Sequence, residues 1–167
     1  STYTVDENQT AVTSISASDV EDEALTISIS GTDEASFNLS SSNVLTFVES
    51  PDYETQSSYS LVASVTDGID TLDKGLTVNL NNLNDNSPVF TSSSSYSADE
   101  NQVAIGTVAA TDADGDSVTY TTSSSDILID GGSGAITFKF APDYEYKTSY
   151  STTITATDGF NSSAQDI

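Results

Sequence analysis

Four short acidic motifs occur twice along this chain of 167 residues, in the same order each time. They are Asp-Glu-Asn-Gln (6–9 and 99–102), Ser-Asp-Val-Glu-Asp with Thr-Asp-Ala-Asp-Gly (18–22 and 111–115), Pro-Asp-Tyr-Glu (51–54 and 142–145) and Thr-Asp-Gly (66–68 and 157–159). The first two recur after 93 residues (99 − 6) and the last two after 91 (142 − 51). A repeat of about 90 residues is the size of a domain and exceeds a solenoid unit. The sequence therefore predicts two similar domains, residues 1–86 and 87–167.

Apolar residues alternate with polar ones within the repeats. The alternating sets are Leu25, Ile27 and Ile29, then Tyr59, Leu61, Ala63 and Val65, and finally Leu76, Val78 and Leu80. A period of two is typical of strands with one buried face, and turn sequences such as Asp67-Gly68 and residues 131–134 separate the runs. Several short strands in each repeat predict an all-β fold, in which each domain is a Greek-key, Ig-like β-sandwich.

The second repeat is shorter at its C-terminal end. After residues 66–68 the first repeat continues through a strand that ends near Leu80, whereas only residues 160–167 follow the second Thr-Asp-Gly. We therefore expect the second domain to lack most of its last strand. Such a sandwich exposes a sheet edge and part of its core, so we expect it to be the less stable domain.

The charge of the chain excludes several classes of partner. Its 26 acidic and 3 basic side chains give a formal net charge of −23. Nucleic acids and anionic membranes are bound by clustered Lys and Arg, so neither is an expected partner. The chain has no Cys and no His, which excludes thiolate chemistry and the usual zinc sites. It also has no apolar run near the ~20 residues of a membrane span, so we expect no direct membrane insertion.

A segment rich in oxygen ligands lies where the two repeats meet. Residues 82–90 read Asn-Leu-Asn-Asp-Asn-Ser-Pro-Val-Phe. Hard cations such as Ca²⁺ require several carboxylate and carbonyl oxygens at once. This composition predicts a calcium-binding joint, at residues 82–88, rather than an active site.

Together these motifs resemble tandem cadherin-type repeats. The matching elements, in the family's order, are residues 99–101 with 105–108, residues 112–114, residues 129–136, residues 142–145, Asp158 and the joint. The chain also lacks Cys, Trp and Met. In this it is similar to the cadherin-like domains of large bacterial surface and secreted proteins. The resemblance implies a location outside the cell or on its surface.

The resemblance also implies a set of calcium ligands and three Ca²⁺ ions at the central joint. The implied ligands are Glu7, Asp52, Glu54, Leu83 (through its carbonyl), Asn84, Asp85, Asn86, Asp112, Asp114 and Asp158. Asn82 stands where the family usually has Asp. Seven of the ligands are carboxylates, and like charges ~4 Å apart repel by roughly 4 kcal/mol at an effective dielectric constant of 20. Three Ca²⁺ ions would bring a charge of +6 against −7 and nearly neutralise the cluster.

The resemblance also implies an incomplete calcium site at each end of the chain. Asp19, Glu21, Asp22 and Asp67 would meet a preceding repeat, and Glu100, Asp143 and Glu145 would meet a following one. Neighbouring repeats of the same chain are therefore expected partners.

Two further patterns in the sequence resemble calcium sites of other kinds. Asp112, Asp114 and Asp116 are spaced like the start of an EF-hand loop, but Ser117 stands where that loop requires Gly. Residues 131–134 resemble a calcium-binding nonapeptide, although a turn between strands is the simpler interpretation. Tyr53, Tyr59, Tyr144 and Tyr150 could stack on sugars, but we expect these corner residues to belong to the core. We expect a solvated surface for Asp33, Glu34, Asp70, Asp73, Asp126 and Asp166.

Three classes of function remain open. In the first, calcium stiffens the joint of an extracellular adhesion or spacer array. In the second, the chain is a carbohydrate-binding or protein-binding module, with a cell-surface glycan or protein as its ligand. The third is a glycoside hydrolase with paired carboxylates, which requires a concave cleft that a small sandwich has little room for. We therefore expect a calcium-dependent module and no enzyme.

Overall fold

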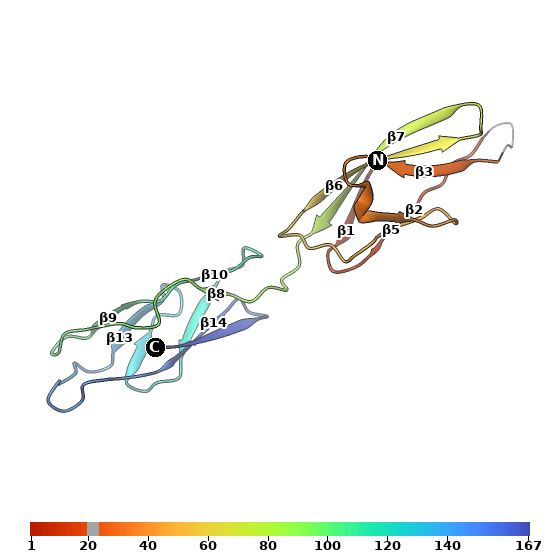
Figure 1. Ribbon diagram of the computed structural model, residues 1–167. Helices are drawn as coiled ribbons and strands as arrows, with labels where there is room; N and C mark the ends of the chain where they lie inside the picture. Colours follow the sequence, from red (N-terminus) through yellow and green to blue (C-terminus); the bar gives the residue numbers. More distant parts are fainter. Residues whose placement is uncertain (20–23) are drawn as a thin grey trace. The chain divides into compact units, whose positions relative to one another are not determined.

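The computed structural model describes residues 1–19 and 24–167, and it consists of two compact units (Figure 1). Unit 1 is Ser1–Leu83 and unit 2 is Asn84–Ile167. Glu21 and Asp22 of the predicted N-terminal half-site lie outside the described residues. Within the described ranges, no helix has the length and apolar character needed to cross a bilayer.

Unit 1 is a sandwich of two β-sheets. One sheet has the order β1-β7-β6-β3, in which β1 runs parallel to β7 and the other pairs are antiparallel. The other sheet is antiparallel with the order β2-β5-β4. The strands are β1 (Thr2–Asp6), β2 (Ala11–Ser14), β3 (Thr26–Ser30), β4 (Phe37–Leu39), β5 (Val44–Phe47), β6 (Ser58–Thr66) and β7 (Thr71–Asn81), with a 3-10 turn η1 (Glu34–Ser36) before β4.

The core of unit 1 follows from the alternation in its two longest strands. Tyr59, Leu61 and Ala63 point inward from β6, and Leu76, Val78 and Leu80 do so from β7. Phe37 and Phe47 of the second sheet close the core, with ring centroids 4.4 Å apart. Burying such side chains stabilises a domain by roughly 1.5–3 kcal/mol each. The predicted inward positions of β6 and β7 are confirmed except at Val65, which is only half-buried.

Unit 2 repeats this sandwich with shorter strands. Its sheets have the orders β11-β14-β15 and β12-β13-β9, and β8 forms a separate pair with β10. The strands are β8 (Val89–Phe90), β9 (Ala104–Thr107), β10 (Ala110–Thr111), β11 (Thr119–Thr122), β12 (Ile127–Ile129), β13 (Ala135–Phe138), β14 (Thr153–Thr157) and β15 (Ser162–Asp166). The core comprises Val108, Tyr120, Ile127, Ile136, Ile154 and Ala156. The residues expected to form a turn, 131–134, connect β12 to β13.

The last strand is the main difference between the units. Strand β7 has 11 residues, whereas its counterpart β15 has 5. In unit 1, β1 pairs with residues 77–81 of β7. The residues of unit 2 that are equivalent to β1 are 95–99, and they belong to no strand. Within the sequence given, β15 is therefore the shorter of the two strands.

One expectation about an individual side chain is wrong. Tyr144 is 63% exposed rather than part of the core. Four of the acids expected on the solvated surface also bind specific partners. Asp33 accepts a hydrogen bond from the Ser60 N–H, Asp73 from the Ser64 hydroxyl and Asp166 from the Thr153 hydroxyl, while Asp126 forms an ion pair with Lys147.

Candidate metal centre

In unit 1, three of the predicted ligands lie together at the end of the sandwich that follows β1. Glu7, Asp52 and Glu54 each place a carboxylate oxygen within 4.8 Å of the other two. Glu7 follows β1 directly, and the backbone turns at Asn8, which has a φ of 63° and donates its N–H to the Pro51 carbonyl over 3.0 Å. Asn tolerates this left-handed conformation better than most residues. The turn therefore brings the Asp-Glu-Asn and Pro-Asp-Tyr-Glu motifs together.

Glu7 is almost fully buried, with 2% of its surface exposed. Its Oε2 accepts the Tyr53 N–H over 2.7 Å, and its Oε1 accepts the Leu83 N–H over 2.7 Å. Two backbone donors therefore satisfy both oxygens of this buried side chain. Glu7 thereby holds Leu83, near the start of the segment 82–90, against the end of unit 1 that follows β1.

Asp52 organises the loop between Pro51 and Gln56. Its carboxylate accepts the Thr55 hydroxyl over 2.8 Å and the backbone N–H groups of Glu54 and Thr55 over 3.0 and 3.3 Å. The Thr55 hydroxyl, followed by these backbone donors, lowers the pKa of Asp52 below its ordinary value of 3.8 although burial opposes the shift. An acid held ionised in this way is available to a cation through its remaining lone pairs.

In unit 2, Asp85 and Asn86 are hydrogen-bonded to the loop after β10. Asp114 accepts the backbone N–H groups of Asp85 and Asn86 through Oδ2, over 3.1 and 2.9 Å, and the Asn86 side-chain amide through Oδ1 over 2.8 Å. Asp112 Oδ1 in turn accepts the Asp114 N–H over 3.0 Å. The predicted ligands Asp85, Asn86, Asp112 and Asp114 thus lie within one network.

The turn between β14 and β15 adds Asp158 to this end of unit 2. Its Oδ1 accepts the N–H groups of Phe160 and Asn161, each over 2.6 Å. Burial alone would raise the pKa of Asp158, but these backbone donors outweigh it, so the pKa lies below 3.8. Asp158 is therefore a carboxylate at neutral pH.

Two carboxylate oxygens of unit 2 have no partner. Among the described residues, Oδ2 of Asp112 and Oδ2 of Asp158 are both inaccessible to solvent and make no hydrogen bond. A buried anionic oxygen without a donor is costly unless a cation compensates for it. These two oxygens fit a hard divalent cation, which binds oxygen ligands.

Two residues of this site escaped the sequence analysis. Asp116 lies within 4.8 Å of the Asp112 and Asp114 carboxylates, although it appeared only in the rejected EF-hand pattern. Asn161 donates its side-chain amide to Asn84 Oδ1 over 2.9 Å and to the Asn86 carbonyl over 3.2 Å. The sequence held one indication of a role for Asn161. Its counterpart in the first repeat is Asp70, whose carboxylate cannot donate a hydrogen bond, so the two repeats differ in chemistry at this position.

The residues of the predicted half-site at the other end of unit 2 lie together, like the set in unit 1. Glu100, Asp143 and Glu145 place carboxylate oxygens within 4.8 Å of one another. Glu100 Oε2 accepts the Tyr144 N–H over 3.0 Å, as Glu7 accepts that of Tyr53. Glu100 is nevertheless exposed, whereas Glu7 is buried.

A comparison with protein families identifies the chain. Residues 84–167, just over half of it, match the family model described as a bacterial Ig domain. The chain belongs to the bacterial Ig domain family. This bacterial Ig chain is also 37% identical, over 142 residues, to protocadherin Fat 4 of Mus musculus; the match covers 77% of the chain and 3% of Fat 4. It therefore spans only a small part of that relative.

Solved structures similar to this bacterial Ig chain are cadherin ectodomain fragments. Drosophila N-cadherin EC1-4 matches with a TM-score of 0.81 and 22% identity, covering 99% of the chain and 46% of that structure. Human protocadherin-24 EC1-2 matches with a TM-score of 0.78 and 20% identity, covering 99% and 88%. At these identities the likeness concerns the fold, and it confirms two tandem cadherin-like β-sandwich domains. The resemblance to bacterial surface proteins stays a prediction.

Proposed function

We propose that this chain is a calcium-dependent module of an extracellular adhesion or spacer array, in which Ca²⁺ ions make the joint at residues 82–88 rigid. Unit 1 supplies Glu7, Asp52 and Glu54, and unit 2 supplies Asp112, Asp114 and Asp158. The connecting segment supplies the Leu83 carbonyl and the oxygens of Asn84, Asp85 and Asn86. Three Ca²⁺ ions would nearly neutralise the seven carboxylates of this set.

The observation that carries this proposal is the pair of unpartnered oxygens on Asp112 and Asp158. Surface acids that merely face water keep their hydration, so they need no ion. These two oxygens have lost solvent without gaining a donor, which favours a bound cation in the folded protein. Oxygen-only ligands, with no Cys or His anywhere in the chain, favour Ca²⁺ over zinc.

Calcium would act by binding the folded protein and not the unfolded chain. The stability gained is RT ln(1 + [L]/Kd), which is about 2.7 kcal/mol at one hundred times Kd. Ions that take ligands from both carboxylate sets would also restrict bending at the joint. A rigid joint in each repeat lets an array project a distant binding domain away from a surface.

A calcium titration followed by thermal melting tests the proposal. Added Ca²⁺ should raise the melting temperature of the parent chain, and Asp158→Asn should reduce that rise. Asp67 occupies the equivalent turn of unit 1 and accepts the Ile69 and Asp70 N–H groups as Asp158 accepts its own. Asp67→Asn is therefore the matched control and should leave the calcium effect nearly unchanged. Equal loss in both variants, or no response of the parent chain, would refute a site at Asp158.

Small-angle X-ray scattering tests whether calcium makes the joint rigid. With calcium, the distribution of inter-atomic distances should narrow, and chelator should broaden it in the parent chain. The same measurement on Asp158→Asn should show the broad distribution at calcium concentrations that narrow the parent one. An identical distribution with and without calcium would contradict the stiffening of the joint even if ions bind.

A second candidate, a glycan-binding or protein-binding surface, is favoured by exposed aromatic side chains in unit 2. Phe140, Tyr144 and Tyr146 are 77%, 63% and 89% exposed. Exposed aromatic rings are suited to stacking on sugars or to packing against another protein. Saturable binding on a glycan array that Tyr146→Ala abolishes, in the presence of chelator, would support this function over the first.

A further inference from the structure

Unit 1 contains a pocket with a volume of about 340 Å³, lined by residues of the 3-10 turn η1 and of the loop that follows β5. Phe47 and Tyr59 of the core contribute aromatic surface to it. Two acidic residues, Glu49 and Asp52, also belong to its lining. Among the described residues that line this pocket, none is basic. The pocket therefore combines aromatic surface with negative charge.

The surroundings of Tyr59 are negative as well. Burial, followed by the charges of Asp33 and Asp52, raises the pKa of the Tyr59 hydroxyl above its ordinary value of 10.0. The one basic side chain in the sequence of unit 1 is Lys74, which lies on β7 and is not part of the lining. A cation that enters the pocket is therefore attracted by Glu49 as well as by these two aspartates.

The internal repeat matches Tyr59 to a residue of unit 2. Tyr59 is the last residue of a nine-residue stretch that begins with Pro-Asp-Tyr-Glu (51–59). Tyr150 ends the stretch that begins with the same motif in the second repeat (142–150). Each tyrosine belongs to or packs against the core of its own unit. Tyr150 is therefore the counterpart of Tyr59.

A second position of the pocket can be matched through the backbone. Val48 directly follows β5 and donates its N–H to the Ser36 carbonyl over 2.9 Å. Lys139 directly follows β13, the counterpart of β5, and donates its N–H to the Asp126 carbonyl over 2.8 Å. Because the two hydrogen bonds are equivalent, Asp126 in unit 2 stands where unit 1 has Ser36.

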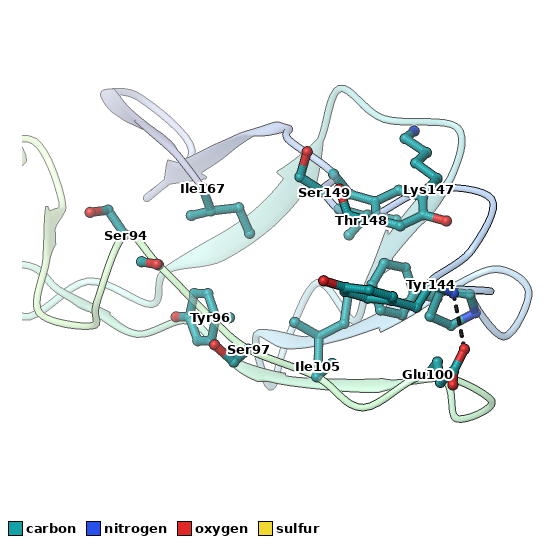
Figure 2. A pocket seen from close by; sticks show the side chains of 16 residues that line it. Ser94, Tyr96, Ser97, Glu100, Ile105, Tyr144, Lys147, Thr148, Ser149 and Ile167 are labelled. Carbon is teal, nitrogen blue, oxygen red and sulfur yellow. Dashed lines mark hydrogen bonds between the residues drawn. The ribbon is translucent and has the colours of Figure 1, made fainter.

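In unit 2, a lysine ammonium group lies between these two counterparts. The Nζ atom of Lys147 is 4.0 Å from the centroid of the Tyr150 ring and 3.5 Å from Asp126 Oδ2. Figure 2 shows the Lys147 side chain. A cation placed over an aromatic ring and beside a carboxylate is attracted by both. Unit 2 thus places an ammonium group where unit 1 has the side of the pocket that Ser36 and Tyr59 form.

Unit 1 does not supply this ammonium group itself. The counterpart of Lys147 is Gln56, which carries no charge. Its side-chain amide donates to Asp33 Oδ1 over 3.1 Å and to the Ser58 carbonyl over 2.9 Å. Gln56 is not among the residues that line the pocket. The position that Lys147 fills in unit 2 is therefore accessible to a lysine from another molecule.

We propose that this pocket of unit 1 binds the side chain of a lysine that belongs to a partner polypeptide. The apolar stem of the lysine lies against the aromatic part of the lining, and its ammonium group lies beside Tyr59 and between Glu49 and Asp52. The net charge of −23 favours a basic partner. Asp52 also belongs to the proposed calcium set, so the test is made in chelator and leaves Asp52 unchanged.

An NMR titration of the whole chain with two capped tripeptides tests the proposal. The probe is Gly-Lys-Gly. The control is Gly-norleucine-Gly, which keeps the four-carbon stem of lysine but carries no charge. The probe should shift the amide resonances of residues 47–52 in a saturable way, and the control should not.

Two variants that each remove one negative charge test the electrostatic part. Glu49→Gln should weaken binding of the probe by about 1.5- to 5-fold, because a carboxylate of the lining is lost. Asp70→Asn removes the same charge from the turn between β6 and β7 and is the matched control. Its effect on Kd should be less than about 1.5-fold, because screening weakens the interaction of distant exposed charges.

A third variant should strengthen binding. Ser36→Asp introduces into unit 1 the acid that unit 2 has at this position, and it should tighten binding of the probe by about 1.5- to 5-fold. Misfolding cannot produce such a gain, so this variant remains informative if Glu49→Gln lowers stability.

Three results would overturn the proposal. The first is the absence of a saturable shift with Gly-Lys-Gly, or an equal shift with the norleucine peptide. The second is an equal weakening of probe binding by Glu49→Gln and Asp70→Asn. The third is unchanged or weaker binding of the probe to Ser36→Asp.

Discussion

The side-chain amide of Asn161 donates a hydrogen bond to the side-chain oxygen of Asn84 over 2.9 Å, although 77 positions separate the two residues. The same amide reaches the backbone carbonyls of Asn84 and Asn86 over 3.3 and 3.2 Å. A single side chain in the β14–β15 turn therefore fixes the first residues of unit 2.

Asn161→Ala should destabilise unit 2 by about 1 kcal/mol, because the side-chain and backbone oxygens of Asn84 and Asn86 lose a shared donor. Urea denaturation in the presence of chelator measures this loss without a contribution from metal. Asp70→Ala changes the equivalent position in unit 1, where the carboxylate cannot donate, and should have a smaller effect. Equal losses in the two variants would contradict the assigned role of Asn161.

Glu7→Gln should cost about 1–3 kcal/mol of stability even without calcium. Glu7 receives a backbone N–H on each carboxylate oxygen, and a glutamine would turn its own amide N–H groups toward one of those donors. Chemical denaturation in chelator reports the change. Glu100→Gln is the matched control, because Glu100 is exposed and its glutamine keeps one oxygen for the Tyr144 N–H. We expect it to change stability by about 0.5 kcal/mol or less.

Gly134→Ala should destabilise unit 2 by about 2–4 kcal/mol. Gly134 has a φ of +70°, and an added Cβ would meet the carbonyl oxygen of Val108. Gly132→Ala, in the same turn, would place its Cβ at 3.8 Å from Asp130 Oδ1, an ordinary contact distance. Thermal melting should therefore separate the two variants clearly. A mild effect of Gly134→Ala would show that the β12–β13 turn can shift away from Val108.

Asp130→Asn should alter the pH dependence of stability in calcium-free buffer. The Ser133 N–H, followed by the Ser133 hydroxyl and the Gly132 N–H, lowers the pKa of Asp130 below 3.8. A lowered folded-state pKa contributes stability that is fully present above the unfolded value and is lost as the pH falls through the folded one. The difference in melting temperature between the parent chain and the variant should therefore be constant above about pH 5 and shrink below 3.8.

If that difference instead grew on acidification, the Asp130 carboxylate would not be stabilised by the turn. Measuring the difference between the two chains, rather than either chain alone, cancels the effect of the other acids. Those acids titrate in the same range, and protonating them relieves the repulsion that accompanies a net charge of −23.

Much of the fold was accessible from alternation alone. Leu76, Val78 and Leu80 were predicted to face inward, and they do so because adjacent residues of a strand point to opposite faces. The repeated motifs likewise predicted that unit 2 copies unit 1. Prediction failed at Tyr144, because the burial of a side chain depends on which distant parts of the fold pack against it and not on its own motif.

The family resemblance implied a set of candidate ligands but not the hydrogen bonds that connect them. It named Glu7, Asp52, Asp112 and Asp158 without indicating which oxygens would be left unpartnered. Asn161 could not be assigned its role, because hydrogen bonds to Asn84 and Asn86 depend on how the β14–β15 turn meets a segment far away in the sequence.

The sequence by itself determined two like β-sandwiches, their inward faces and the acids available to a cation, because these follow from local periodicity and from the residues' own chemistry. Only the tertiary structure decided that Glu7 is buried and accepts a hydrogen bond on each carboxylate oxygen. Its second donor is Leu83, 76 positions away in the sequence, and no local pattern around Glu7 encodes that contact.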